Sequence, residues 1–170
     1  MIRNTSSRFL LVATGLVLVA SSASCTDPVR DQQIEALGSE EPGVPMGPEH
    51  RPGQPCVLCH SAGGPAEKAP FVIAGTIYEN GNSQVGLAGA AVSFVDSVGG
   101  RRIADTNAAG NFYITESDWR DLAFPFKVAV QQGPNTKEMS TTVNREGSCA
   151  FCHKGRGSYD AITQVYTAAP

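Results

Sequence analysis

The chain has 170 residues, of which 41% are hydrophobic and 17% charged, and this length suits one small domain with flexible appendages. Its 13 basic and 16 acidic residues give a net charge of -3, and no run of Lys or Arg interrupts the sequence. This balance argues against nucleic acid or an anionic membrane surface as the partner.

Residues 1–24 have the pattern of a secretory signal peptide, in which two arginines precede an apolar run over residues 9–20 and small residues follow it. The run is too short for a membrane-spanning helix, which needs roughly 20 residues. Cys25 comes next and resembles the lipidation site of bacterial lipoproteins, although Ser22 stands where that pattern usually has leucine. We therefore expect export to the periplasm, the outer membrane or the cell surface, with a lipid anchor on Cys25. Cleavage without lipidation is the alternative.

Residues 25–54 are rich in Pro, Gly, Glu and Asp and lack apolar periodicity of the helical or the strand kind. This segment is predicted to be a disordered tether between the anchor and a folded domain at residues 55–170. No part of the chain predicts a long amphipathic helix.

Short runs of β-branched and aromatic residues begin at Phe71 and are separated by turn residues. Residues 97–100 and 107–110 end in glycine and fit hairpin loops, and residues 80–82 form a third turn. Strict alternation in the first run places Phe71 on the same face as Ile73. The predicted strands, about seven in number, lie at residues 71–78, 89–96, 101–106, 110–115, 126–132, 138–143 and 161–167.

Short strands without a long helix predict an all-β fold, an antiparallel β-sandwich in which two sheets share one core. Residues 71 to about 145 contain AGTIY, GLAGAAVSFVDSVGG and ADTNAAGNFYI. They resemble the carboxypeptidase-regulatory-like family, an Ig/transthyretin-like sandwich with G-T-V, G-A-x-V and T-x-x-x-G-x-F/Y patterns. The resemblance implies the fold and not the function, because this scaffold is widely reused.

Two complete C-x-x-C-H motifs flank most of the predicted strands and use every cysteine except Cys25. The motif is the attachment signature of c-type haem. Two thiols three residues apart reach the two vinyl groups at one porphyrin edge, and the adjoining histidine becomes the proximal iron ligand. The sequence therefore predicts two haem c groups per chain. The attachment cysteines are Cys56 and Cys59 for the first haem and Cys149 and Cys152 for the second, and the proximal ligands are His60 and His153.

Other interpretations of the cysteine pairs stay open. A four-cysteine zinc site has suitable spacing but is less natural in an exported chain, where thiols oxidise. Disulfides do not explain why a histidine follows each pair, and a thioredoxin-like redox motif lacks its βαβ context. The whole arrangement, with a Pro-Gly segment at residues 50–55 before the first motif, resembles a group of small exported dihaem cytochromes from bacteria with extensive extracellular electron transfer.

Two six-coordinate haems need two distal ligands, and the sequence offers few candidates. His50 is the only histidine outside the motifs, and Met46 and Met139 are the only methionines after the leader. We expect His50 and Met139 to be the distal ligands, without assigning either to a particular haem. The alternatives are an exposed loop histidine and a core methionine. Met46, a lysine, the N-terminal amine or an open water-bearing position are further options at one haem.

These observations predict an electron carrier rather than an enzyme, passing single electrons between redox partner proteins. No Arg/His pair of the kind that a haem peroxidase uses is recognisable. One alternative is an electron-donating subunit of a larger oxidoreductase, and another is a surface-anchored structural sandwich stapled by zinc or disulfides. Residues 71–78 and 161–167 are expected to pair as first and last strands, which would place both haems at one end of the sandwich.

Overall fold

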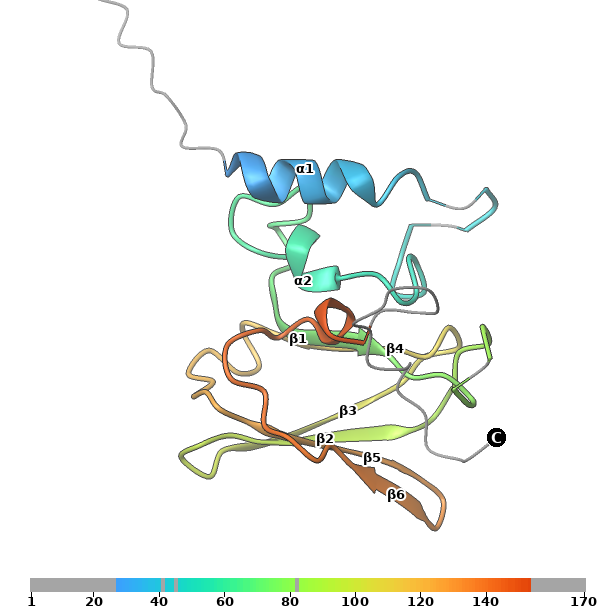
Figure 1. The fold of residues 1–170 in the computed structure, drawn as a ribbon, viewed down its shortest axis with the longest axis vertical. Helices are drawn as coiled ribbons and strands as arrows, with labels where there is room; N and C mark the ends of the chain where they lie inside the picture. The colour runs from blue at the N-terminus through green and yellow to red at the C-terminus, as the bar shows by residue number, and fades with distance from the viewer. Residues whose placement is uncertain (1–26, 41, 45, 82, 154–170) are drawn as a thin grey trace, which may run out of the picture.

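The computed structural model describes residues 27–40, 42–44, 46–81 and 83–153. Its strands form two antiparallel sheets around one apolar core, which confirms the predicted all-β sandwich (Figure 1). One sheet pairs β1 (Phe71–Thr76) with β4 (Asn111–Thr115). The other sheet has the order β3-β2-β5-β6 and consists of β2 (Ala91–Val95), β3 (Arg101–Asp105), β5 (Lys127–Gln132) and β6 (Asn135–Glu138).

The core lies between the two sheets and combines branched aliphatic side chains with aromatic rings. Burying each large apolar side chain stabilises the fold by roughly 1.5–3 kcal/mol. The buried members are Ile73, Ile77, Ala90, Val92, Phe94, Phe112, Ile114, Trp119, Phe126 and Val130.

The two predicted hairpin loops have different roles. Residues 97–100 join β2 to β3 in one sheet, where Asp96 Oδ1 accepts hydrogen bonds from the amides of Val98 (3.0 Å) and Gly100 (2.6 Å). Residues 107–110 form a tight turn with Gly110 at φ +76°, but they carry the chain from β3 in one sheet to β4 in the other. The second loop is therefore a crossing between sheets and not a hairpin.

Six strands are present among the described residues, and the end of the chain differs from the prediction. The expected strand at residues 138–143 is replaced by β6, whose residues all lie on an exposed edge and carry no apolar alternation. Of the predicted strand, Glu138 ends β6, and Val143 forms an isolated bridge with Phe126. The strand expected at residues 161–167, and its pairing with residues 71–78, lie outside the described residues.

β1 departs from strict alternation because of an irregularity between Phe71 and Ile73. Ile73 is paired with Ile114 and faces the core, whereas Phe71 is paired with Thr115 on the face turned away from the four-stranded sheet, called the outer face below. The predicted placement of Phe71 beside Ile73 is therefore wrong, since a β-bulge adds one residue and re-aims the side chains that precede it.

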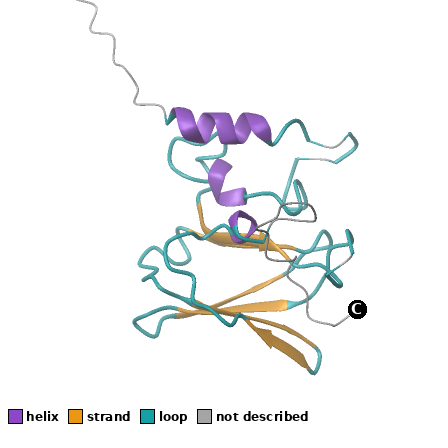
Figure 2. Cartoon of the chain, in the orientation of Figure 1, coloured by secondary structure: helices purple, strands orange, loops and turns teal. Residues whose placement is uncertain are grey.

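The helical segments gather on the side of the β1–β4 sheet (Figure 2). They are α1 (Pro28–Ala36), α2 (Cys56–Cys59) and the 3₁₀ turn η1 (Cys149–Phe151). None of the described helices is long and apolar enough to cross a membrane.

The region predicted as a disordered tether contains one helix, α1, among its described residues. Asp27 caps α1 by accepting hydrogen bonds from the amides of Val29 and Arg30. Arg30 then donates to the carbonyls of Ala62 (2.7 Å) and Gly63 (2.8 Å), which ties the helix to the loop after α2. α1 buries no side chain, so it lacks the apolar periodicity by which a sequence reveals a helix.

Candidate functional site

Each C-x-x-C-H motif forms a single helical turn, which is α-helical in α2 and 3₁₀ in η1. In each, the amide of the histidine donates to the carbonyl of the first cysteine, from His60 to Cys56 and from His153 to Cys149, both at 2.9 Å. Residues three apart in such a turn lie on one face, so both thiols of a motif share a side. This arrangement follows from the spacing alone and is what attachment to one porphyrin edge requires.

Both motifs lie against β1, although they approach it differently. The first motif covers the outer face, where the Gly53 amide donates to Thr76 Oγ1 at 2.7 Å and the Phe71 amide donates to the His60 carbonyl at 2.8 Å. The second follows the edge of β1 that β4 leaves open, through a parallel bridge between Ala74 and Ser148. Segments nearly 90 residues apart in sequence are thus brought to one strand (Figure 1).

Gly75 makes room for the second motif. A Cβ atom at this position would lie 2.8 Å from Cβ and 3.0 Å from Sγ of Cys149, and 2.9 Å from the ring of Phe112. Gly147 is equally restricted, because a Cβ there would collide with the carbonyl of Val72. Any larger residue at either glycine would push the second motif away from β1.

Burial raises the pKa of three motif thiols, those of Cys56, Cys59 and Cys149. Burial raises the pKa of Cys56 to about 11. Burial also raises the pKa of Cys149 to about 12, with the nearby Cys56 acting in the same direction. Burial raises the pKa of Cys59 as well, against an opposing effect of Arg51. Redox-active and metal-ligating cysteines have lowered pKa values, so these surroundings do not suit a thioredoxin-like motif.

His60 is prepared for a ligand at one ring nitrogen. Its Nδ1 lies 2.8 Å from the carbonyl of Ala69, and this contact selects the tautomer with the proton on Nδ1. Its Nε2 is shielded from solvent and has no hydrogen-bond partner in the described part of the protein. Leaving such an atom unsatisfied costs about 1–3 kcal/mol. Metal-bound histidines commonly show this pattern, in which a backbone carbonyl orients the ring and the other nitrogen binds the metal.

His50 lies beside His60, with ring centroids 5.9 Å apart and ring planes at 76°. With metal–nitrogen bonds of about 2 Å, two imidazoles on opposite sides of one metal ion have centroids about 6 Å apart. Of the predicted distal ligands, His50 is therefore the one that the structure brings to the first motif.

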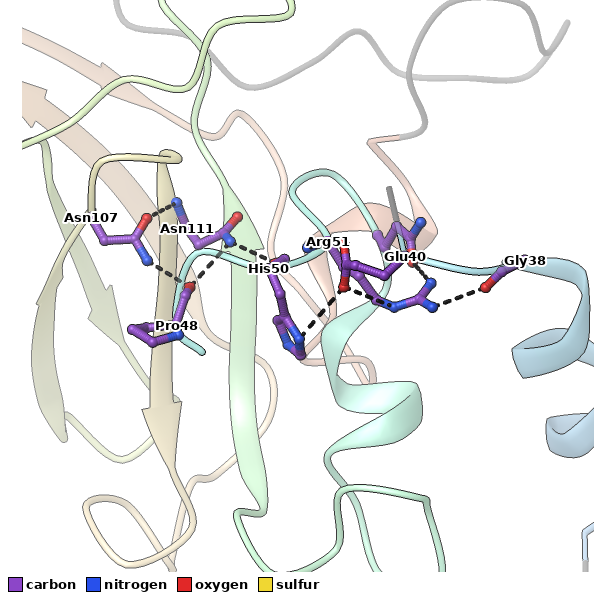
Figure 3. A network of polar contacts seen from close by, with 8 residues as sticks. Gly38, Glu40, Pro48, His50, Arg51, Asn107 and Asn111 are labelled. Atoms are coloured by element: carbon purple, nitrogen blue, oxygen red, sulfur yellow. Dashed lines mark hydrogen bonds and ion pairs between the residues drawn. The ribbon is translucent and has the colours of Figure 1, made fainter. Parts of the chain in front are cut away.

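A polar network holds the segment that carries His50 (Figure 3). The side chain of Asn111 donates to the carbonyls of Pro48 (3.3 Å) and His50 (3.0 Å). On the other side, Nδ1 of His50 lies 3.8 Å from Glu40 Oε2, and Arg51 Nε lies 3.4 Å from the same oxygen. The backbone of Arg51, a member of this network, has φ +48°, which is an uncommon conformation for a residue with a side chain.

The second motif borders an apolar cavity of about 440 Å³ between the sheets. Ligand cavities of this size class are typical of cofactor sites. Met139 and His153 both line it, together with core side chains such as Phe112 and Phe126. Met139 follows β6 directly, and its amide donates to the carbonyl of Val128 at 2.9 Å, which keeps it at the cavity. The structure thus brings Met139 to the second motif.

The remaining candidates are distributed as follows. Met46 is 88% exposed, so it has no place at either site. The four motif cysteines are described and unpaired, and within the described residues no three His, Cys, Asp or Glu side chains gather to hold a metal ion. A four-cysteine zinc site therefore has no geometric support here. Cys25 and the leader lie outside the described residues.

Several residues of the site were not predicted from the sequence. Gly75 had a usable signal, because a glycine inside a strand often marks the close approach of another backbone. No signal in the sequence indicated Glu40, Asn111 or the outer-face position of Phe71, because each acts through partners that are distant in the chain.

No family model matches the chain, and no curated protein or solved structure matches it either. The resemblances to the transthyretin-like family and to dihaem cytochromes therefore remain predictions. The residues themselves fit haem on two observations, the shielded and unpartnered Nε2 of His60 and the apolar cavity beside His153.

Proposed function

We propose that the chain is an exported dihaem c-type cytochrome that carries single electrons. The observation that carries the proposal is His60, whose ring is oriented by the Ala69 carbonyl and whose shielded Nε2 has no partner among the described residues. A histidine with one shielded ring nitrogen, directly after two cysteines in one helical turn, matches the needs of a thioether-bound haem.

The proposed ligand sets differ between the two sites. His60 and His50 would hold the first haem iron, and His153 and Met139 the second. Bound haem supplies one-electron redox chemistry. The chain supplies the ligands, the apolar surroundings and the hydrogen bonds that orient the histidines, and these together tune the potential.

The shared contact with β1 supports a second part of the proposal, that the two haems lie close enough for rapid electron exchange. Cys56 is near enough to Cys149 to raise its pKa, and this proximity of the two motifs supports the expectation. We expect interacting spins or split potentials in a redox titration. Two fully independent haems would contradict this part.

The direct test is the mass of protein produced with a haem-maturation system. We expect the polypeptide mass plus about two haems, with thioether links that survive denaturation and give a positive haem stain. The double variant Cys56→Ser/Cys59→Ser should lose one haem, and Cys149→Ser/Cys152→Ser should lose the other. A mass without haem, or a denaturation-sensitive zinc content instead, would overturn the proposal in favour of a structural sandwich.

Export and anchoring are tested separately at Cys25. We expect wild-type protein in the membrane fraction and Cys25→Ser protein in the soluble fraction, both with two haems. No redistribution would mean that the leader is cleaved without lipidation, and it would leave the haem proposal standing.

A further inference from the structure

Three aromatic rings stack from the first site to the surface. His60 and Phe71 have centroids 4.0 Å apart with planes at 6°, and Phe71 and Tyr113 have centroids 4.5 Å apart with planes at 11°. We call these three side chains the ring column. Tyr113 is 40% exposed, so the column runs from the half-buried imidazole of His60 to solvent.

The bulge in β1 is what places Phe71 in the column. Tyr113 and Thr115 occupy the outer face of β4, and the bulge moves Phe71 from the face of Ile73 to this outer face. Bulges next to functional sites often re-aim a side chain in this way. The irregularity in the strand and the stack on His60 are therefore one structural feature.

Phe71 has little freedom to rotate, because His60 covers one face of its ring and Tyr113 the other. The backbone adds to this, since the Phe71 amide donates to the His60 carbonyl. The imidazole is in turn confined by the stack and by the bond from Nδ1 to Ala69. Its plane lies at 76° to the plane of His50.

We propose that Phe71 is a positioning residue that fixes the imidazole plane of His60 steeply across that of His50. This inference rests on the proposed function, because it concerns an iron between these two histidines. The relative orientation of two axial imidazoles decides how their π orbitals split the iron d orbitals. Crossed planes leave two of these orbitals nearly equal in energy and give a ferric electron paramagnetic resonance (EPR) signal with one large g value. Parallel planes give a rhombic signal with three well-separated g values.

The experiment compares EPR spectra of the oxidised full-length dihaem protein. His50→Ala identifies the signal of the first site, because it removes one of that iron's ligands. In wild-type protein we expect this signal to have a single large g value. Phe71→Leu, which keeps an apolar side chain but removes the stacked ring, should shift the signal towards the rhombic type and broaden it.

Two control variants distinguish a change in the orientation of the His60 ring from a general disturbance of the fold. Phe71→Tyr keeps the stacked ring and should retain the wild-type signal. Phe124→Leu removes an aromatic ring outside the column, 38% exposed, and should also leave the signal unchanged. A shift in Phe71→Leu alone would support the inference.

The outcomes separate failure of the inference from failure of the proposed function. Protein without haem on the first motif overturns the proposed function. Haem present by mass, with a rhombic wild-type signal or the same signal in Phe71→Leu, overturns only the role of Phe71. If Phe71→Leu does not fold, the wild-type signal still tests the inference. A rhombic wild-type signal would overturn it, because such a signal is incompatible with crossed imidazole planes.

Discussion

Both motifs form a single helical turn, but they differ in their surroundings. The first lies on the outer face of β1, where a second histidine and a polar network of Asn111, Glu40 and Arg51 adjoin it. The second borders an apolar cavity between the sheets, where the adjoining candidate ligand is the thioether of Met139. The same sequence motif is thus combined with different environments. Because axial ligands, burial and hydrogen bonds set haem potentials, we expect the two sites to have unequal potentials, with the second higher.

The largest effect is expected from Gly75→Val, which disturbs the contact between β1 and the second motif. The added methyl groups would need the space that Cys149 and Phe112 occupy, so the second motif or β1 must shift. Overpacking of this kind destabilises a fold by about 1–3 kcal/mol. We expect a lower midpoint of thermal unfolding and a changed spectrum of the second site, with a smaller change at the first site, which also lies against β1. Gly75→Ala should show a weaker form of both effects, and no effect in either variant would contradict the contact with Cys149.

His50→Ala attacks the first site. Loss of one axial imidazole should leave one of the two irons high-spin, and this is measured by the absorption and EPR spectra of the ferric protein. Glu49→Ala changes the exposed neighbouring residue and should keep both irons low-spin. Low-spin iron at both sites in His50→Ala would show that another group completes the first site.

Met139→Ala probes the difference in potential itself. A thioether ligand favours ferrous iron, so its removal should lower the higher of the two potentials and abolish the weak red absorption band of Met-ligated ferric haem. Met46→Ala is the matched control, since Met46 is largely exposed, and it should leave both unchanged. If Met139→Ala keeps the wild-type spectra and potentials, Met139 lines the cavity and is not an iron ligand.

The smallest effect is expected from Glu40→Gln. The carboxylate of Glu40 is partly exposed and lies 3.8 Å from Nδ1 of His50. Its negative charge should stabilise the ferric state of the first site modestly. Removing the charge should therefore raise the lower potential slightly, by less than the change in Met139→Ala. Glu49→Gln removes a charge without this contact and serves as the control in the same redox titration. A lowered potential in Glu40→Gln would contradict the assignment.

Features that depend on neighbouring residues were accessible from the sequence. The spacing within each C-x-x-C-H motif was enough to predict that its two thiols share a side and that the histidine adjoins them, because one turn of chain fixes these positions. The glycines at 99 and 110 marked real turns, since both adopt positive φ values. Alternating β-branched and aromatic residues predicted the sandwich, because burial of one face of each strand enforces the pattern.

Only the tertiary structure decided how these local pieces meet. Alternation could not predict the bulge that turns Phe71 to the outer face, because a single extra residue leaves no mark in composition. Nor could spacing pair His50 with His60 or Met139 with His153, since the first pair depends on contacts from Asn111 and Glu40 and the second on a cavity between two sheets. α1 was missed for a related reason. Its attachment runs through Arg30 to the loop after α2, and polar contacts between distant segments have no periodicity for a sequence to display.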